Sequence, residues 1–407
     1  MAVTPLNNER EGVKIMENIY ILEGARTPFG SFGGILKDVD PTDLGVTVSK
    51  EAIKRSGVTP EDIDFTVMGN VIHSANNAPY LARHMALKTG IPIQSPAFAV
   101  NRLCGSGMQS VISAAQSILL GEGSAALAGG TESMSLAPHA LRGSRFGTKL
   151  AAPQVDDMLW SALTDEYIGG GMGVTAENLA EKHNISREQQ DEYAAESHKR
   201  AAEARNSGRF SEEIVPVEVK SRKSTEMVDT DEHIREDTKP EFLAKLKPAF
   251  RKNGTVTGGN ASGINDGAGA VVVAGEKFVE EKNLKPAARI VSWSVAGVEP
   301  DYMGIGPVPA IKQALKKAGL TLDDMAVVEV NEAFAAQYLS VEKELGLDRS
   351  RVNVNGGAIA LGHPIGASGT RVLYSLIKEL QRRNEKYGVA SLCIGGGQGI
   401  AMVVEAQ

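Results

Sequence analysis

The sequence predicts an α/β protein whose sheet is covered by helices, and three observations carry this prediction. Strand-like apolar runs alternate with segments of helical periodicity along most of the chain. The 44 glycines gather where the strands would end. The alternation occurs twice, before and after a charged segment at about residues 135–262. Such alternation is typical of folds in which helices pack on a sheet.

The individual elements follow from apolar periodicity. In the first run, strands are predicted at residues 19–22, 65–69, 97–100 and 125–130, and a helix at residues 108–120. In the second run, strands are predicted at residues 327–330, 352–355, 389–394 and 401–404, and a helix at residues 369–380. The last two strands are expected to form a hairpin. Because both runs place Gly-rich turns at strand ends, we expect two related halves.

A division of the chain follows from these runs. We predict a disordered tail at residues 1–17, a first half at 18–134 plus 263–285, an inserted subdomain at 135–262 and a second half at 286–407. Within the insertion, Ser186 and Gln189 form a capping box that opens a charged helix ending near Phe210. We expect this helix to be a solvated face rather than a site. The polar stretch at residues 220–252 is expected to be irregular.

Composition excludes several classes of protein. The chain has 407 residues, 42% of them hydrophobic, and a net charge of -7, which gives no basic surface for nucleic acid. No apolar run approaches the roughly 20 residues that span a bilayer. Cys104 and Cys393 are the only cysteines, too few for a disulfide framework, and neither they nor the histidines show a metal-ligand spacing. The first fifteen residues, with Glu9 and Glu11 and no apolar block, resemble no targeting signal, so a cytoplasmic protein is expected.

Cys104 stands between a predicted strand and a predicted helix, in the segment NRLCGSG (101–107). The positive end of a helix dipole stabilises a thiolate, and glycines let a substrate approach the backbone. Cys104 is therefore a candidate nucleophile. The alternative is a buried structural cysteine, since cysteine is among the most buried residue types.

Two further candidates lie in Gly-rich segments of the second half. His363 lies in GHPIGASG (362–369), and histidine is the side chain best suited to take a proton from a thiol near neutral pH. The alternative for His363 is an ordinary turn residue. Cys393 ends a strand and precedes Gly395 in CIGGGQG (393–399), where free backbone amides can bind an oxyanion. The alternative for Cys393 is a glycine hairpin with a buried cysteine.

Asn331 follows the predicted strand at 327–330, in the segment NEAFA (331–335). The carboxyl ends of strands are where α/β folds place catalytic groups. Capping of the following helix explains Asn331 equally well. Taken together, the candidates predict acyl transfer through a cysteine, with a histidine base and backbone amides that stabilise an oxyanion.

These four segments, in their order along the chain, resemble the thiolase family, and the resemblance covers the chain from about Ile19 onward. Further matching segments are ARTPFG (25–30), AGGTESMS (128–135), GGNASG (258–263) and the stretch 353–369. The resemblance implies a five-layer αβαβα core of two similar halves with an inserted loop subdomain, assembled as a homotetramer. The implied reaction is the reversible, CoA-dependent cleavage or Claisen condensation of 3-ketoacyl-CoA, with CoA and acyl-CoA as the partners and no further cofactor.

The resemblance also implies a role for each candidate. Cys104 is acylated, and His363 activates it. Cys393 moves the α-proton of the second acyl-CoA. Asn331 holds a water that forms one oxyanion hole together with His363, and the amides of Cys104 and Gly395 form the other.

Substrate contacts are implied for Arg235, near the CoA nucleotide, and for Ser262, Met172, Leu163 and Phe334, around the rest of the substrate. One position departs from the short-chain biosynthetic thiolases, which carry a histidine where this chain has Gly171. Fatty-acid-degrading thiolases of the mitochondrial type also lack that histidine. We therefore expect acetoacetyl-CoA and longer 3-ketoacyl-CoA as substrates, with an acetoacetyl-CoA-specific enzyme as the alternative.

Two other functions compete with this one. A decarboxylating ketoacyl synthase on the same fold has no second cysteine in a Gly-rich C-terminal segment, so Cys393 and the NEAFA segment argue against it. A non-catalytic acyl-CoA-binding protein has no need of Cys104, His363, Asn331 and Cys393 together.

Overall fold

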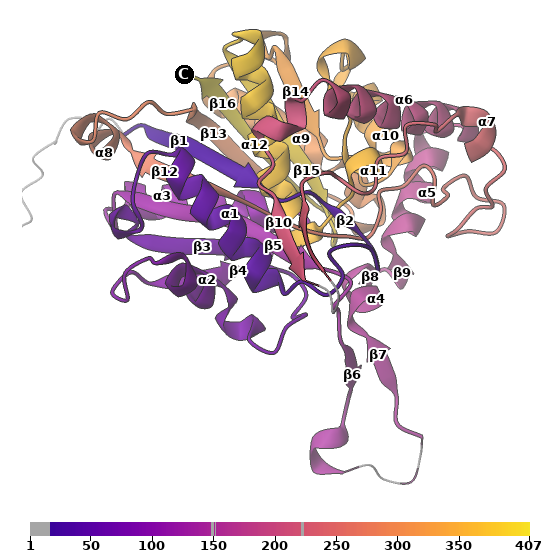
Figure 1. The fold of residues 1–407 in the computed structure, drawn as a ribbon. Helices are drawn as coiled ribbons and strands as arrows, with labels where there is room; N and C mark the ends of the chain where they lie inside the picture. The colour runs from indigo at the N-terminus through magenta and orange to yellow at the C-terminus, as the bar shows by residue number, and fades with distance from the viewer. Residues whose placement is uncertain (1–16, 148–149, 151, 221–223) are drawn as a thin grey trace, which may run out of the picture.

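The computed structural model describes residues 17–147, 150, 152–220 and 224–407, and it shows a layered stack of helices and strands (Figure 1). The tail predicted at residues 1–17 lies outside the described residues, apart from Glu17. Within the described part, no helix is both long and apolar enough to cross a membrane.

A ten-stranded sheet runs through the molecule in the order β14-β15-β16-β13-β1-β12-β5-β3-β4, with β2 (Gly30–Ser31) paired to β12. Its first-half strands are β1 (Ile19–Arg26), β3 (Phe65–Gly69), β4 (Ala97–Val100), β5 (Ala125–Ser133) and β12 (Asn265–Gly275). Its second-half strands are β13 (Ala288–Gly297), β14 (Val327–Val330), β15 (Tyr387–Ile394) and β16 (Gln398–Ala406). The halves join where the start of β1 pairs antiparallel with β13. The hairpin predicted at the C-terminus is confirmed as β15 and β16.

The two halves of the sheet form two layers, and helices form the three others, one between the halves and one on each outer face. Helices α3 (Ser106–Leu119) and α12 (Ile365–Arg383) pack on each other and on strands of both halves, so they form the central layer. The outer layers are α1 (Pro41–Arg55) with α2 (Leu81–Thr89) on the first half, and α9 (Pro307–Ala318) with α10 (Ala335–Leu345) on the second. Residues 365–377 of α12 are all buried, as a helix covered on every side requires. The predicted layered α/β fold is confirmed.

The two halves share one strand order. Strands β3, β5, β12 and β1 follow one another in the first half as β14, β15, β16 and β13 do in the second. The counterpart of β4 is reduced to a single bridge between Val328 and Val352, so the strand predicted at residues 352–355 is wrong. The reason is local: Asn353, at φ 47°, and Gly356, at φ 76°, take left-handed conformations that end an extended segment.

The segment at 135–262 is more regular than its sequence suggested. Helix α6 (Arg187–Asn206) starts from the predicted capping box of Ser186 and Gln189. One face of α6 is buried, where Tyr193 and Ser197 donate hydrogen bonds to Glu332, so the expectation of a solvated helix is wrong for that face. The stretch expected to be irregular contains a hairpin and a short helix: β10 (Val217–Lys220), β11 (Thr225–Val228) and α7 (Pro240–Leu243).

The remaining elements lie around this frame. Strands β6 (His139–Leu141) and β7 (Val155–Asp157) form an arm that projects from the body (Figure 1). The others are α4 (Met158–Ala162), β8 (Thr164–Asp165), β9 (Gly170–Gly171), α5 (Met172–His183), α8 (Glu276–Glu281) and α11 (Ala358–Leu361).

Candidate active site

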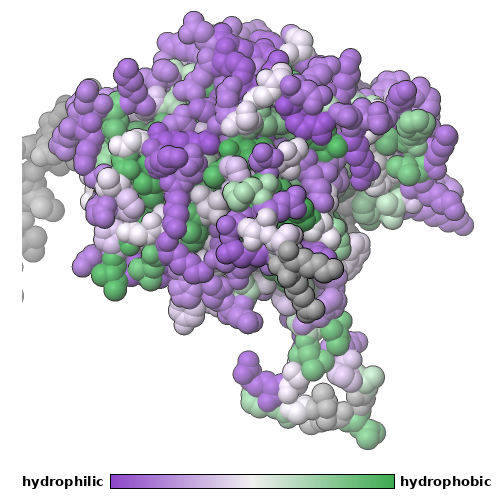
Figure 2. Space-filling view, viewed as in Figure 1, coloured by the Kyte–Doolittle hydropathy of each residue, from purple (hydrophilic) through white to green (hydrophobic). Residues whose placement is uncertain are grey.

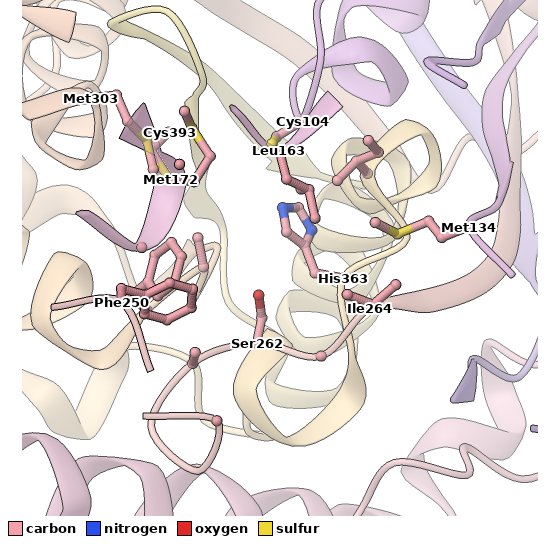
Figure 3. A pocket seen from close by; sticks show the side chains of 18 of the residues that line it. Cys104, Met134, Leu163, Met172, Phe250, Ser262, Ile264, Met303, His363 and Cys393 are labelled. Atoms are coloured by element: carbon pink, nitrogen blue, oxygen red, sulfur yellow. The ribbon is translucent and has the colours of Figure 1, made fainter. Parts of the chain in front are cut away.

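Cys104, His363 and Cys393 line one cavity of about 190 Å³. Figure 3 shows the His363 ring beside the Cys104 side chain, with Cys393 on the opposite wall. Cys104 stands two residues before α3, and His363 stands two residues before α12. Cys393 is the second-last residue of β15. The ends of the central helices and of β15 therefore bring together three groups that are far apart in the sequence.

Four of the five predicted substrate contacts line the same cavity: Leu163, Met172, Ser262 and Phe334. The rest of the wall is mostly apolar and includes Met134, Trp160, Phe250, Ile264, Met303 and Ile365. Arg235 does not line it; this residue is exposed, and its backbone N–H donates to His198 Nδ1 at 3.1 Å. A narrow apolar cavity with a few polar groups suits a flexible chain that ends in a reactive carbonyl.

Cys104 is a thiol at rest. Burial raises the pKa of Cys104 to about 11, although hydrogen bonds from the backbone N–H groups of Gly395 and of Cys104 itself lower it. Helix α3 begins only at Ser106, with Gly105 as its N-cap. Desolvation therefore outweighs the nearby donors, so the positive end of helix α3 is not sufficient by itself to give a thiolate. Cys104 needs a base to become a nucleophile.

The backbone around Cys104 forms a tight turn. Leu103 has φ 45°, a left-handed conformation that is costly for a branched side chain. A Cβ atom at Gly105 would lie 2.5 Å from Ile394 Cδ1, so only glycine lets this turn approach the end of β15. The close approach places Cys104 against the backbone of Gly395.

His363 has the protonation state that a base requires. Its Nδ1 lies 2.6 Å from Ser368 Oγ, and that hydroxyl donates to the Pro364 carbonyl at 2.8 Å. The Ser368 oxygen therefore accepts from Nδ1–H, which assigns Nε2 as the unprotonated nitrogen. Burial, followed by the charge of Arg371, lowers the pKa of His363 to about 3. A neutral His363 can accept the proton of Cys104 at Nε2.

Asn331 lies behind His363 rather than in the cavity wall. Its Nδ2 is 3.4 Å from His363 Nε2, and its Oδ1 accepts a hydrogen bond from Arg371 Nη2 at 3.3 Å. Helix α10 begins at Ala335 with Phe334 as its N-cap. Helix capping therefore does not explain Asn331, and its amide is directed at the site.

Cys393 is buried, at 1% exposure, and it faces the same cavity as Cys104. Burial, followed by the neighbouring Cys104, raises the pKa of Cys393. Because each sulfur disfavours a charge on the other, the pair carries at most one negative charge at a time. Such a pair suits two proton transfers that occur in sequence.

Three residues that hold the site carried no assigned role in the sequence. Ser368 fixes the tautomer of His363, and Arg371 fixes the amide of Asn331. Glu132 accepts the N–H group of Gly366, three residues after His363, at 3.0 Å, together with two N–H groups that follow β3. Ser368 and Glu132 lie in two segments that match the thiolase family, at residues 362–369 and 128–135. Nothing in the sequence pointed to Arg371 beyond its place in the helix predicted at residues 369–380. Within the described residues, no cluster of His, Cys, Asp or Glu suits a metal ion.

Known proteins resemble this chain over almost its whole length. The family model described as Thiolase, N-terminal domain, matches residues 19–277, and Thiolase, C-terminal domain, matches residues 284–406. A human protein named 3-ketoacyl-CoA thiolase, mitochondrial, is 53% identical over 393 residues, which are 96% of this chain and 99% of the relative. The acetyl-CoA acetyltransferase of Syntrophomonas wolfei is 50% identical over 392 residues, which are 95% and 98%. The crystal structure of human mitochondrial 3-ketoacyl-CoA thiolase in complex with CoA has a TM-score of 0.94 at 52% identity, covering 97% of this chain and 99% of that one.

These comparisons correct one expectation. The cytoplasmic location expected from the sequence is wrong, since the human relative is named mitochondrial. That expectation rested on the first fifteen residues, which lie outside the described part of the chain.

Proposed function

The chain belongs to the thiolase family, and on this premise we propose that its acyltransferase reaction runs through an acyl-enzyme on Cys104, with Cys393 moving the α-proton. The reaction is the reversible, CoA-dependent cleavage and Claisen condensation of 3-ketoacyl-CoA. One observation carries the proposal of roles: a thiol, a neutral imidazole and a second thiol line the same apolar cavity. A direct test follows the absorbance of the magnesium-enolate of acetoacetyl-CoA, which should fall when enzyme and free CoA are added; an unchanged absorbance would contradict the activity.

In the direction of cleavage, His363 Nε2 takes the proton of Cys104, and the sulfur attacks the 3-keto carbon. The bond between C2 and C3 breaks, its electron pair forms the enolate of acetyl-CoA, and Cys393 supplies the proton to C2. The acyl group stays on Cys104 until the sulfur of CoA attacks it. The Cys393 thiolate then takes the proton of the CoA thiol, and His363 returns its proton to the Cys104 sulfur as that sulfur leaves. Exchange of one thioester for another is nearly thermoneutral, so the transfer of the acyl group between Cys104 and CoA runs in both directions.

Two carbonyls develop negative charge, so two sets of donors are needed. The N–H groups of Cys104 and Gly395 already point to the Cys104 sulfur and would stabilise the oxyanion of the acyl group. Asn331 lies behind His363, with its Nδ2 3.4 Å from His363 Nε2, and the two residues would serve the enolate oxygen through a bound water. Removing one such donor typically costs about 3 kcal/mol of transition-state stabilisation.

Gly171 supports a longer acyl chain than acetoacetyl. It lines the cavity, and the nearest atom to a Cβ placed there is the Leu163 carbonyl oxygen at 3.6 Å, an ordinary contact, so a side chain at this position would fit and would take up space in the cavity. Each buried methylene contributes about 0.8 kcal/mol to binding. We expect kcat/KM to fall less than tenfold from four- to six-carbon substrates, and Gly171→His to shift preference toward four carbons. A steeper fall in the wild-type enzyme would return it to the acetoacetyl-specific alternative. The Syntrophomonas wolfei relative is named acetyl-CoA acetyltransferase.

Arg235 is the proposed contact for the CoA nucleotide. The protein has a net charge of -7, so an anionic nucleotide must be bound by local basic residues, and Arg235 is exposed in the inserted segment. Arg235→Ala should raise KM for CoA substrates with little change in kcat, the mark of binding lost equally in ground and transition states. A collapse of kcat at unchanged KM would contradict this assignment.

A homotetramer is the proposed assembly. Strand β4 is a sheet edge with Phe98 exposed, and the arm of β6 and β7 carries exposed Phe146 and Leu150. Figure 2 shows hydrophobic residues, in green, on this arm. An open sheet edge can pair with another chain, and exposed apolar residues that gather together mark interaction sites. Light scattering should give four times the chain mass, and removal of the arm should give a dimer. A monomer at micromolar concentration would contradict the proposal.

A further inference from the structure

Arg371 is a buried cation with few partners. Its side chain is 1% exposed, in the middle of the central helix α12. Its Nη1 lies 3.9 Å from Glu329 Oε2, a loose ion pair, and its Nη2 donates to Asn331 Oδ1 at 3.3 Å. Nε has no hydrogen-bond partner among the described residues. A guanidinium is costly to bury, and partners this weak do not offset that cost. The contact with Asn331 is therefore the feature to explain.

The contact selects one orientation of the Asn331 amide. The oxygen and nitrogen ends of an asparagine side chain have nearly the same shape, so neighbours decide which end points where. A guanidinium only donates hydrogen bonds, so it takes the carbonyl end. The amide nitrogen is then left on the side of His363 Nε2, at 3.4 Å.

We propose that Arg371 is a positioning residue for the enolate step: it holds the carbonyl of Asn331 so that the amide N–H groups face His363 and the water that would serve the enolate oxygen. This inference rests on the thiolase reaction proposed above. Without Arg371, the amide can turn and present its oxygen to a developing negative charge, which repels it.

The charge of Arg371 acts in the same direction as its hydrogen bond. A fixed positive charge in a water-poor site stabilises an anion that forms nearby. Glu329 does not cancel this charge fully, because burial raises the pKa of Glu329 to about 8. The purely structural alternative is that Arg371 only fills space between the two halves.

A double-mutant cycle separates these two accounts. Arg371→Met and Asn331→Ala are made alone and together, and thiolysis of acetoacetyl-CoA is measured with far-ultraviolet circular dichroism as the check on folding. Tyr374→Phe is the matched control, because Tyr374 is another buried polar residue of α12 whose hydroxyl donates to Glu23. Arg371→Lys keeps the charge, and it takes the place of Arg371→Met in the double-mutant cycle if the methionine variant does not fold.

Arg371→Met should lower kcat on the order of tenfold to hundredfold with little change in KM, the range seen when an oxyanion donor is disturbed. Arg371→Lys should recover part of this loss, and Tyr374→Phe should match the wild-type enzyme. When Asn331 is already alanine, Arg371→Met should lower kcat by less than a further threefold. Wild-type turnover for Arg371→Met, or a loss that multiplies in full with that of Asn331→Ala, would overturn the inference. Failure of the wild-type enzyme to cleave acetoacetyl-CoA would instead refute the proposed function.

Discussion

The two halves of the sheet place different polar groups at corresponding strand ends. In the first half, β3 leads to Asn70, whose Nδ2 donates to Glu132 near the end of β5 at 3.1 Å. Glu132 also accepts backbone N–H groups, so both side chains are used within the fold. In the second half, β14 leads to Asn331, which faces His363, and Cys393 lies near the end of β15 in the cavity wall.

The two central helices also have different reactive groups at corresponding positions. Cys104 and His363 each stand two residues before a central helix, α3 in one half and α12 in the other. One fold therefore presents a nucleophile from the first half and its base from the second. In the proposed mechanism, the first half therefore holds the acyl group on a rigid support, whereas the second half supplies the groups that move protons. The following predictions test this division, from the largest effect to the smallest.

Replacing the one reactive group of the first half should have the largest effect. In Cys104→Ser, a hydroxyl replaces the thiol, and a serine ester is a deeper trap than a thioester. Thiolysis of acetoacetyl-CoA should fall by on the order of 10³-fold or more while the fold is kept. If the serine variant kept a tenth of wild-type turnover, the acyl group would be carried elsewhere.

Replacing the second cysteine should divide the reaction. Cys393→Ala should still be acylated at Cys104 and exchange acyl groups between thiols, because His363 and the Gly395 amide remain. Exchange of the α-protons of acetyl-CoA for deuterium should fall by roughly 10²- to 10⁴-fold, the usual contribution of a positioned acid or base. Proton exchange is measured by mass spectrometry of the recovered acetyl-CoA. Equal loss of both partial reactions would remove the division between the halves.

Weakening the support in the first half should cost both stability and rate. In Glu132→Gln, the new side-chain NH₂ group meets backbone N–H groups that also donate, so buried donors lose their acceptor. This loss should lower the unfolding free energy by about 1–3 kcal/mol. Turnover should fall severalfold, because Gly366 in the loop of His363 loses its acceptor.

Glu177→Gln is the control for this change. Glu177 is also buried, and it accepts the N–H groups of Thr255 and Val256. Urea unfolding and turnover are measured for both variants, and the control should lose similar stability at unchanged turnover. Equal turnover in the two variants would mean that Glu132 does not hold the site.

The smallest expected effect concerns the pH at which the two cysteine thiols ionise. Because burial raises the pKa of Cys104 to about 11 and that of Cys393 above its usual range, the free enzyme should show no thiolate near neutral pH. The ultraviolet absorbance of thiolate, followed from pH 6 upward, should rise only in the alkaline range. Cys104→Ser identifies the contribution of the first-half sulfur. A thiolate already present at neutral pH would restore the helix-dipole explanation and make His363 unnecessary as a base.

The sequence was sufficient for the parts of the molecule that local pattern determines. Apolar periodicity predicted β3, β4 and β14, and the resemblance of four segments to the thiolase family predicted that Cys104, His363 and Cys393 meet. The pKa of Cys104 was not predictable, because desolvation depends on neighbours from both halves. The contact of Arg371 with Asn331 was equally hidden, since it joins residues 40 positions apart.

The central claim is that Cys104, and not Cys393, carries the acyl group. The most direct measurement is mass spectrometry of the peptides from enzyme exposed briefly to acetyl-CoA and then stopped with acid. We predict one acetyl group on the peptide that contains Cys104 and none on the peptide that contains Cys393. An acetyl group found only on the Cys393 peptide would contradict the account and reverse the roles of the two halves.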